Sequence, residues 1–311
     1  MFDARTASLP AIIAHLQAEL RAGARRIVLE VGDPDLGRGR YAGERIELAD
    51  PRAQGFVHRP FRVWVDLAER LGLRLLTPRA TTPPWIALAF EPLDPEARLR
   101  PTAEDATERY GAGSAFQRIS KLEDPGFVLD LAEALARADL APGARVLDLG
   151  VNTGDELALV QWLVPALSPA SFVGVDHSAS ALAVARRRFP EAQLIEADLN
   201  TLPALGLGRF DLVLSIGTLH SPGIDDREVL RRIVQDHLAP QGAVILGFPN
   251  CRYVDGEVEY GTRMKNFCQP ELGLLIKDVA FYRKYLQQHH RQVFVTGKHY
   301  VLVTGVAVPA R

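Results

Sequence analysis

The stretch VLDLGVNTGDE (146–156) decides the fold. Its apolar start predicts a buried strand, and Gly150 and Gly154 predict a tight turn that opens a helix. Asn152 stands in the middle of this turn, where a positive φ is often required and where asparagine is tolerated better than most residues. Units of this kind build doubly wound sheets, which bind ligands beyond the carboxyl ends of their strands. The turn alone does not choose the ligand, because dinucleotide-binding proteins share it.

Strand-like and helical runs alternate on both sides of this stretch. The predicted strands cover residues 144–150, 171–176, 192–198, 210–217 and 242–248. The predicted helices cover residues 125–140, 155–164, 179–188, 226–237 and 271–289. Strands that alternate with helices form right-handed crossovers and therefore a parallel sheet. The last two predicted strands, 292–297 and 300–308, flank Gly297 and Lys298, so we expect an antiparallel hairpin at the end of a seven-stranded sheet.

The first hundred residues predict a smaller α/β domain. Helices are expected at 9–22, capped by Ser8, and at 61–73. The strands expected here cover residues 25–32, 44–49, 73–77 and 85–92. The segment 91–106 is rich in proline and charge, which indicates a linker. We therefore expect an N-terminal domain over 1–100, without a motif that gives its role, and a second domain over 101–311.

Composition narrows the class of protein. The chain has 311 residues, 47% hydrophobic and 24% charged, as in ordinary globular proteins. The formal charge is +2 over 1–100, −8 over 101–250 and +4 over 251–311, so no part has the basic excess of a general nucleic-acid binder. Only two cysteines occur, which fits a reducing cytoplasm. No uninterrupted apolar run of 18 residues and no apolar signal core are present, so we expect a cytoplasmic protein without a membrane span.

Acidic residues end the second and third strands of the predicted sheet. Asp176 follows Gly154 by 22 residues, and a carboxylate at this place can accept hydrogen bonds from both hydroxyls of a ribose. Asp198 could accept a hydrogen bond from an adenine amino group. The alternatives are a helix cap for Asp176 and a simple turn for Asp198. His177, beside Asp176, flanks the same place.

At these residues the chain resembles the class I S-adenosyl-L-methionine (SAM)-dependent methyltransferases. The resemblance is carried by VLDLGVNTG, in which Asn152 replaces the usual glycine, and by GVD (174–176), EADL (196–199) and FDLVLSIGTLH (210–220). It covers about residues 110–308 and implies a Rossmann-like fold with SAM as cofactor. It further implies that Gly150 and its neighbours hold the methionine part, Asp176 the ribose and Asp198 the adenine. The implied cofactor-binding residues are Asp148, Gly150, Asn152, Gly154, Asp176, His177, Asp198, Leu199 and Ser215.

The acceptor side carries less signal. His220 follows the fourth strand and is a candidate general base, since imidazole titrates near neutral pH, although structural packing is the alternative. The polar and aromatic stretch 247–267 predicts a substrate loop, in which Tyr253 is the second catalytic candidate. The other candidates in this loop are Glu257, Tyr260, Lys265 and Asn266. The segment 110–127 precedes the first strand and predicts a lid over the cofactor. Cys251 is expected to be inert, because the Pro-Cys pair of cysteine-dependent RNA methyltransferases is absent.

The favoured reading is a methyltransferase that acts on a small molecule. An RNA methyltransferase and a SAM-binding protein without turnover remain alternatives, the latter because of Asn152. Aminopropyl transfer is disfavoured, because SIGTLHS (215–221) offers no acidic residue for a polyamine. No metal is expected. The first domain is expected to shape the substrate entrance or to form a homo-oligomer contact.

Overall fold

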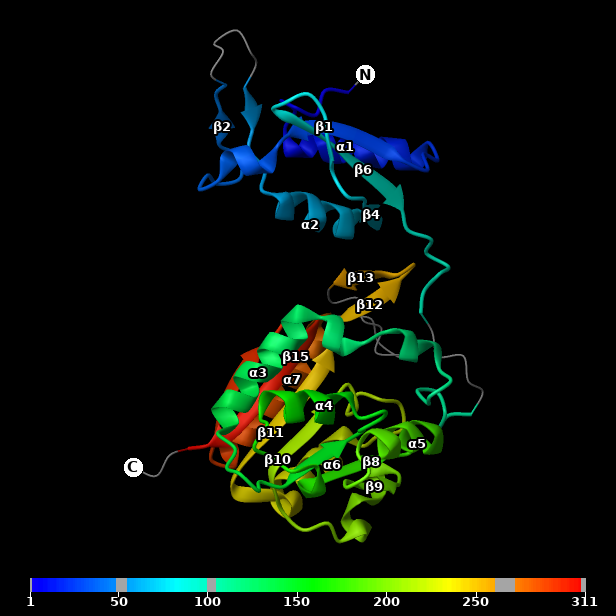
Figure 1. The fold of residues 1–311 in the computed structure, drawn as a ribbon, viewed down its shortest axis with the longest axis vertical. Coiled ribbons are helices and arrows are strands. Elements are labelled where there is room, and N and C mark those ends of the chain that lie inside the picture. Colours follow the sequence, from blue (N-terminus) through cyan, green and yellow to red (C-terminus); the bar gives the residue numbers. More distant parts are fainter. Residues whose placement is uncertain (1, 49–54, 100–104, 261–271, 309–311) are drawn as a thin grey trace. The chain divides into compact units, whose positions relative to one another are not determined.

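The computed structural model describes residues 2–48, 55–99, 105–260 and 272–308. The chain divides into two compact units. The first unit comprises Met1–Arg98 and Arg252–Glu259, and the second comprises Leu99–Cys251 and Tyr260–Arg311. Figure 1 colours both along the sequence.

The second unit is built on one mixed sheet. Within the described residues this sheet has seven strands in the order β14-β15-β11-β10-β7-β8-β9. The strands are β7 (Val146–Leu149), β8 (Phe172–Asp176), β9 (Gln193–Glu196), β10 (Phe210–Ile216), β11 (Leu238–Pro249), β14 (Arg291–Thr296) and β15 (Tyr300–Ala307). The pairs from β11 to β9 are parallel, whereas β15 is antiparallel to both β11 and β14. The predicted Rossmann-like sheet with a closing antiparallel hairpin is confirmed.

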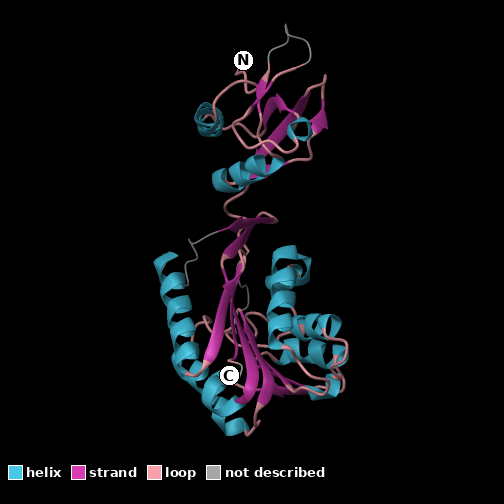
Figure 2. Cartoon of the chain, turned by 90° about the vertical axis from the view of Figure 1, so that its left-hand side faces the viewer, coloured by secondary structure: helices cyan, strands magenta, loops and turns pink. Residues whose placement is uncertain are grey.

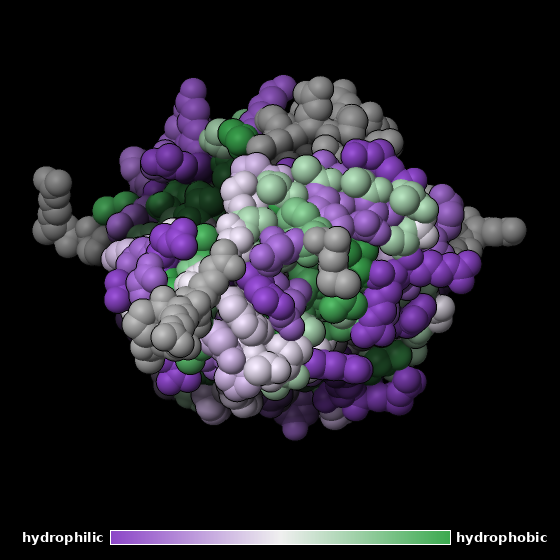
Figure 3. Space-filling view, turned by 90° about the horizontal axis from the view of Figure 1, so that it is seen from above, coloured by the Kyte–Doolittle hydropathy of each residue, from purple (hydrophilic) through white to green (hydrophobic). Residues whose placement is uncertain are grey.

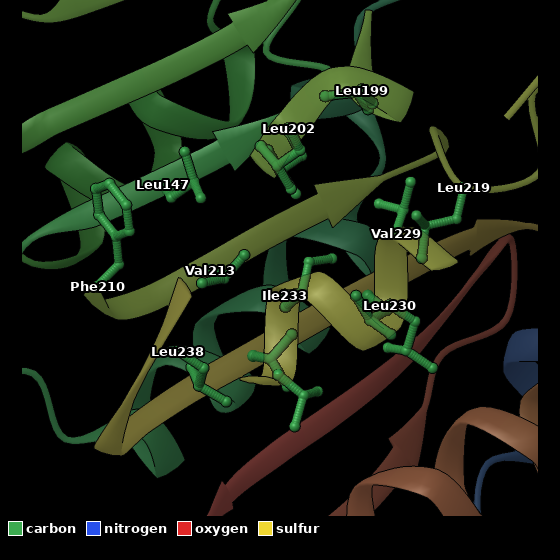
Figure 4. Packing of buried hydrophobic residues seen from close by; sticks show 14 of the residues in the cluster. Leu147, Leu199, Leu202, Phe210, Val213, Leu219, Val229, Leu230, Ile233 and Leu238 are labelled. Atoms are coloured by element: carbon green, nitrogen blue, oxygen red, sulfur yellow. The ribbon is translucent and has the colours of Figure 1, made fainter. Parts of the chain in front are cut away.

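Helices cover both faces of this sheet (Figure 2). They are α3 (Pro125–Ala138), α4 (Asp155–Leu163), α5 (Ala179–Arg188), α6 (Asp226–Arg232) and α7 (Leu272–Gln288). One face buries a cluster with α6 and α7, in which Leu230 and Ile233 lie over Val213 of β10 (Figure 4). The other face buries a second cluster with α3, α4 and α5. The helix expected over 226–237 is confirmed as α6, which continues as a π-helical turn over Ile233–His237.

The first unit contains a small antiparallel sheet. The strands β1 (Ile27–Gly32), β4 (Leu73–Leu75) and β5 (Arg79–Ala80) all pair with β6 (Trp85–Pro92). The helices α1 (Leu9–Arg21) and α2 (Phe61–Leu71) pack on it through Ile12, Leu16 and Trp64. Ser8 caps α1 as expected, by accepting a hydrogen bond from the Ala11 amide at 3.3 Å. The strand expected over 44–49 is short: β2 (Arg45–Ile46) pairs only with β3 (Phe56–Val57).

A hairpin that follows β11 in the sequence belongs mostly to the first unit. Its strands are β12 (Cys251–Val254) and β13 (Glu257–Tyr260). Arg74 of β4 forms ion pairs with Asp255 and Glu257, both at 3.2 Å, and also donates a hydrogen bond to the Asp255 carbonyl. The sequence places these residues in a loop of the second domain. The structure shows instead a hairpin whose turn residues, Asp255 (φ 49°) and Gly256 (φ 81°), both have positive φ.

Polar and apolar side chains are intermixed on the face shown in Figure 3. Among the helices of the described ranges, none has the length and apolarity that a membrane crossing requires. Residues 261–271, which include the substrate-loop candidates Lys265 and Asn266, lie outside the described part of the chain.

Candidate active site

The glycine-rich turn after β7 has the backbone that the sequence predicts. Gly150 and Gly154 have φ values of 83° and 87°, and Asn152 adopts a positive φ of 47°. A side chain at Gly150 would overlap that of Thr218, so the turn after β10 lies directly against this turn. Gly154 precedes the first residue of α4 and faces Phe189. Glycine is needed at both places for conformation and for space.

Asp176 joins this turn to the turn after β8. Its Oδ2 accepts a hydrogen bond from the Asn152 amide at 2.8 Å, and its Oδ1 accepts one from the Ser178 amide at 2.9 Å. The N-cap of α5 is Ser178, whose hydroxyl accepts from the Ala181 amide, so Asp176 is not the helix cap. Each carboxylate oxygen has two lone pairs, and both oxygens therefore keep capacity for a ligand hydroxyl.

Asp148 is a buried carboxylate without a partner. Its side chain lies on β7, and neither oxygen has a hydrogen-bond partner among the described residues. Burial and the charge of Glu156 hold the pKa of Asp148 well above its usual range, although Lys121 acts in the opposite direction. Lys121 pairs with Glu156, which is only 2% exposed. Burial opposes the charge of Lys121, but Glu156, Tyr300 and Asp148 together outweigh it and raise the pKa of that ammonium.

The remaining cofactor candidates occupy different environments. Asp198 is exposed and caps the short 3-10 helix Leu199–Leu205 by accepting from the Asn200 amide at 2.8 Å. Leu199 is buried in the core, whereas His177 is exposed. Ser215 is fully buried on β10. Leu214 pairs with Asp148, and successive side chains of a strand alternate, so Ser215 lies on the opposite face of the sheet from Asp148.

A segment before α3 contacts both the turn after β7 and the turn after β8. Glu108 accepts hydrogen bonds from the Ser178 hydroxyl at 3.2 Å, from the Ser180 amide at 3.2 Å and from the Ser180 hydroxyl. These hydrogen bonds lower the pKa of Glu108. Because Ser178 and Ser180 start α5 beside Asp176, Glu108 fixes the segment at the turn after β8.

Asn152 holds the same segment at the other turn. Its Nδ2 donates to the Tyr110 carbonyl at 2.8 Å, and its Oδ1 accepts from Gln117 Nε2 at 2.8 Å. The sequence predicts a positive φ and a cofactor-binding role for Asn152, and it does not single out Glu108 or Gln117. Nothing in the local pattern marks these two residues, because the contacts that join them to the turns cross 35 or more positions of the sequence. The predicted lid over 110–127 thus contacts the turns, and its role as a lid stays a prediction.

His220 lies in a compact network beyond β10. Its Nε2 is 3.6 Å from Asp278 Oδ2 of α7, and its ring lies 4.6 Å from that of Phe248. Arg227 donates to Asp278 Oδ1 at 3.0 Å and pairs with Asp226 at 3.5 Å. Burial lowers the pKa of His220 from its ordinary value of 6.5, although Asp278 acts in the opposite direction.

The second catalytic candidate belongs to the other unit. Tyr253 lies on β12 within Arg252–Glu259 and is half-buried, so the two catalytic candidates belong to different compact units. Cys251 is buried at the start of the same strand. The described residues contain no group of three or more histidine, cysteine and acidic side chains that could hold a metal ion.

Comparison with known proteins finds a methyltransferase-like segment within the second unit. A family model described as "Methyltransferase domain" matches residues 146–242. The trans-aconitate 2-methyltransferase of Delftia acidovorans is 34% identical over 122 residues, which are 39% of this chain and 44% of that protein. The Escherichia coli protein of the same name is 34% identical over 119 residues, which are 38% and 44% of the two chains. The chain thus spans less than half the length of these relatives.

Solved methyltransferase structures also match part of this chain. A putative methyltransferase from Haloferax volcanii, in complex with its Trm112 activator, covers 67% of this chain and 100% of its own at 17% identity, with a TM-score of 0.45. The family match includes β7 to β10 with the glycine-rich turn and Asp176. The sheet order, with its closing antiparallel hairpin, fits the same fold. Residues 146–242 thus match a methyltransferase domain, and this part of the chain is similar to the SAM-dependent methyltransferases.

Proposed function

We propose that the protein transfers a methyl group from SAM to a small molecule. The observation that carries this proposal is Asp176, a buried carboxylate that joins the turns after β7 and β8 and keeps a lone pair on each oxygen. The small-molecule acceptor is supported by the relatives, which are named for trans-aconitate.

The residues of the site fit this cofactor. SAM carries two positive groups, a sulfonium and an ammonium, and Asp148 is a buried carboxylate with two unpartnered oxygens. Asp176 would hold the ribose, and the turn from Gly150 to Gly154 would hold the methionine part. When bound, SAM supplies a methyl group that an acceptor lone pair takes, while the carbon–sulfur bond breaks and its electron pair stays on sulfur.

The other candidates complete the proposal. Asp198, Leu199 and His177 would flank the adenosine, and Ser215 lies on β10, whose carboxyl end would form the floor of the site. His220 would accept the proton of the acceptor, and Tyr253 is to be tested separately because it belongs to the first unit. The two cysteines in the chain favour a reducing compartment, and we propose the cytoplasm. For the first unit we propose a role in acceptor entry or in a homo-oligomer contact.

Two measurements test the proposal. Calorimetry with SAM and with its demethylated product is expected to show binding of both. Radiolabelled methyl transfer into a cell extract, fractionated into small molecules, RNA and protein, is expected to label the small molecules. Label in the RNA fraction would show that the acceptor is RNA and not a small molecule. Binding of SAM without methyl transfer would indicate a SAM-binding protein without turnover. Failure to bind either compound would refute the cofactor assignment.

A further inference from the structure

The network around His220 has a defined set of charged and titratable groups. Asp278 and Tyr282 come from α7, and Asp226 and Arg227 come from the start of α6. Tyr282 donates a hydrogen bond to Asp226, and Arg227 bridges Asp226 and Asp278. Among the described residues these are the charged and titratable groups around the imidazole.

Aromatic rings close the same network. Phe248 of β11 stacks on Tyr282 at 4.9 Å with an interplanar angle of 6°, and it also contacts the His220 ring. Burial raises the pKa of Tyr282, and its hydrogen bond to Asp226 acts in the same direction, so the phenol is neutral. Two carboxylates and one guanidinium then leave the network with a net charge of −1 when His220 is neutral.

The position of Asp278 determines which imidazole nitrogen carries the proton. His220 Nε2 is buried and has no hydrogen-bond partner among the described residues, but it faces Asp278 Oδ2 at 3.6 Å. A lone pair at Nε2 would be repelled by this carboxylate, whereas an N–H would be attracted. The proton of the neutral ring therefore belongs on Nε2, which leaves the lone pair on Nδ1. Distances of this length are common in catalytic pairs without ligand.

The network is also close to the cofactor turn. Thr218 lies two residues before His220, and its side chain is so close to Gly150 that a Cβ atom there would overlap it. Asn200, next to the proposed adenine residue Asp198, accepts from the Asp225 amide at 3.0 Å, one residue before α6. The turn that carries His220 is thus held against both ends of the proposed SAM site.

We propose that His220 Nδ1 removes a proton from the acceptor, that Asp278 is its positioning residue, and that the acceptor atom is therefore a hydroxyl or ammonium group rather than a carboxylate. This inference rests on the proposed methyltransferase function. A carboxylic acid has a pKa near 4 and has no proton to lose at neutral pH, so it needs no base. A network of charge −1 would also repel a polycarboxylate. The acceptor would thus differ from the compound for which the relatives are named.

The step is balanced without a further reactant. A hydroxyl oxygen gives a lone pair to the methyl carbon while its proton passes to His220 Nδ1; an ammonium nitrogen first gives a proton to Nδ1 and then attacks with the lone pair that this frees. In both cases the methyl–sulfur bond breaks and its electron pair stays on sulfur. The imidazolium that forms keeps its Nε2 proton directed at Asp278, whose charge stabilises it. Solvent then takes the proton from Nδ1 and restores the neutral ring.

The chemical stability of the methylated product tests the acceptor class. The full chain is incubated with methyl-tritiated SAM and the small-molecule fraction of an extract, and the product is treated with mild alkali. Methyl esters release volatile methanol, whereas methyl ethers and methylamines retain the label. We expect the label to be retained and trans-aconitate, added as a probe, to remain unlabelled. Release of the label as methanol, or labelling of trans-aconitate, would overturn this inference but leave the methyltransferase function intact.

Nuclear magnetic resonance tests the positioning role without turnover. In protein labelled with ¹⁵N-histidine, the His220 signals are assigned by their loss in His220→Gln. We expect the neutral ring to carry its proton on Nε2 and to titrate below pH 6.5. In Asp278→Asn the tautomer preference is lost and the pKa falls further, because the charge that stabilises the imidazolium is removed. A proton on Nδ1 in the wild type, or an unchanged tautomer in the variant, would refute the role of Asp278.

Kinetics separates positioning from simple structural support. His220→Gln is expected to lower kcat by about 10²–10⁴-fold, the range of general-base catalysis. Asp278→Asn is expected to move the acidic limb of the kcat–pH profile to lower pH, with SAM affinity unchanged. Asp236→Asn serves as the matched control, because Asp236 is an exposed residue that follows α6 and pairs with Arg232. If the control moved the profile as far as Asp278→Asn, the effect would be structural and the proposal would fail.

Discussion

Replacement of Asp176 by alanine separates the structural and ligand-binding roles of its carboxylate. The substitution leaves the amides of Asn152 and Ser178 without their acceptor, at distances of 2.8 and 2.9 Å. Each bond to a charged acceptor contributes about 1.5–3 kcal/mol. Because the Asn152 amide is only partly buried and can recover a bond to water, we expect the free energy of unfolding to fall by about 2–4 kcal/mol in total.

The same substitution removes the proposed partner of the ribose hydroxyls. We expect SAM affinity to fall by about 1–3 kcal/mol, which corresponds to roughly 5- to 150-fold in Kd. Calorimetry gives the Kd, and urea denaturation without ligand gives the stability. The matched control is Asp211→Ala, because Asp211 also accepts a backbone amide hydrogen bond, from Arg145 at 2.8 Å, but lies at the start of β10. The control should lose stability and keep its affinity. A folded Asp176→Ala protein with wild-type affinity, or an equal loss in the control, would refute the ribose assignment.

Three further substitutions probe the same region. Gly150→Ala combines a strained positive φ with overlap at Thr218. In urea denaturation it should lower the free energy of unfolding more than Gly206→Ala, where φ is also positive (61°) but no atom lies within 4 Å. Equal losses would show that the Thr218 side chain moves away without a cost. Asp148→Asn should stabilise the protein without ligand, and more at pH 8 than at pH 5: the folded-state pKa is raised, so ionisation costs stability as the pH rises above about 4. A pH-independent effect would argue against this buried charge. Lys121→Met leaves Glu156 buried without its cation and should lower the free energy of unfolding by about 3–5 kcal/mol. The double variant with Glu156→Gln should recover part of this loss. If it recovers none, the pair contributes through packing and not through charge.

The local patterns of the sequence were sufficient for the frame of the second unit. The alternation of strands and helices predicted β7 to β11, and Gly297 with Lys298 predicted the hairpin of β14 and β15. The helix bounds agree within a few residues, because caps such as Ser178 and Asp124 are short-range signals. The strand and helix order of the second unit could therefore be predicted from the sequence pattern alone.

Contacts between distant parts of the sequence could not be predicted from local patterns. Glu108 meets Ser180 across 72 positions, and Asp278 comes to His220 from 58 positions away. Only the packing of the helices on the sheet creates these pairs, and a single sequence taken alone gives no sign of them. The β12–β13 hairpin is different, because Asp255-Gly256 between two strand-like runs is a recognised turn signal that the loop interpretation overlooked.

The β12–β13 hairpin also affects the order in which the chain can fold during synthesis. Domains generally fold from the N-terminus as they leave the ribosome. Here the first unit receives its last part, Arg252–Glu259, only after the strands β7 to β11 have been made. On a nascent chain, Arg74 therefore has no contact with Asp255 and Glu257 until some 180 further residues have been synthesised. The first unit is complete late, and a fragment that ends at Arg98 would represent an intermediate of synthesis rather than a finished domain.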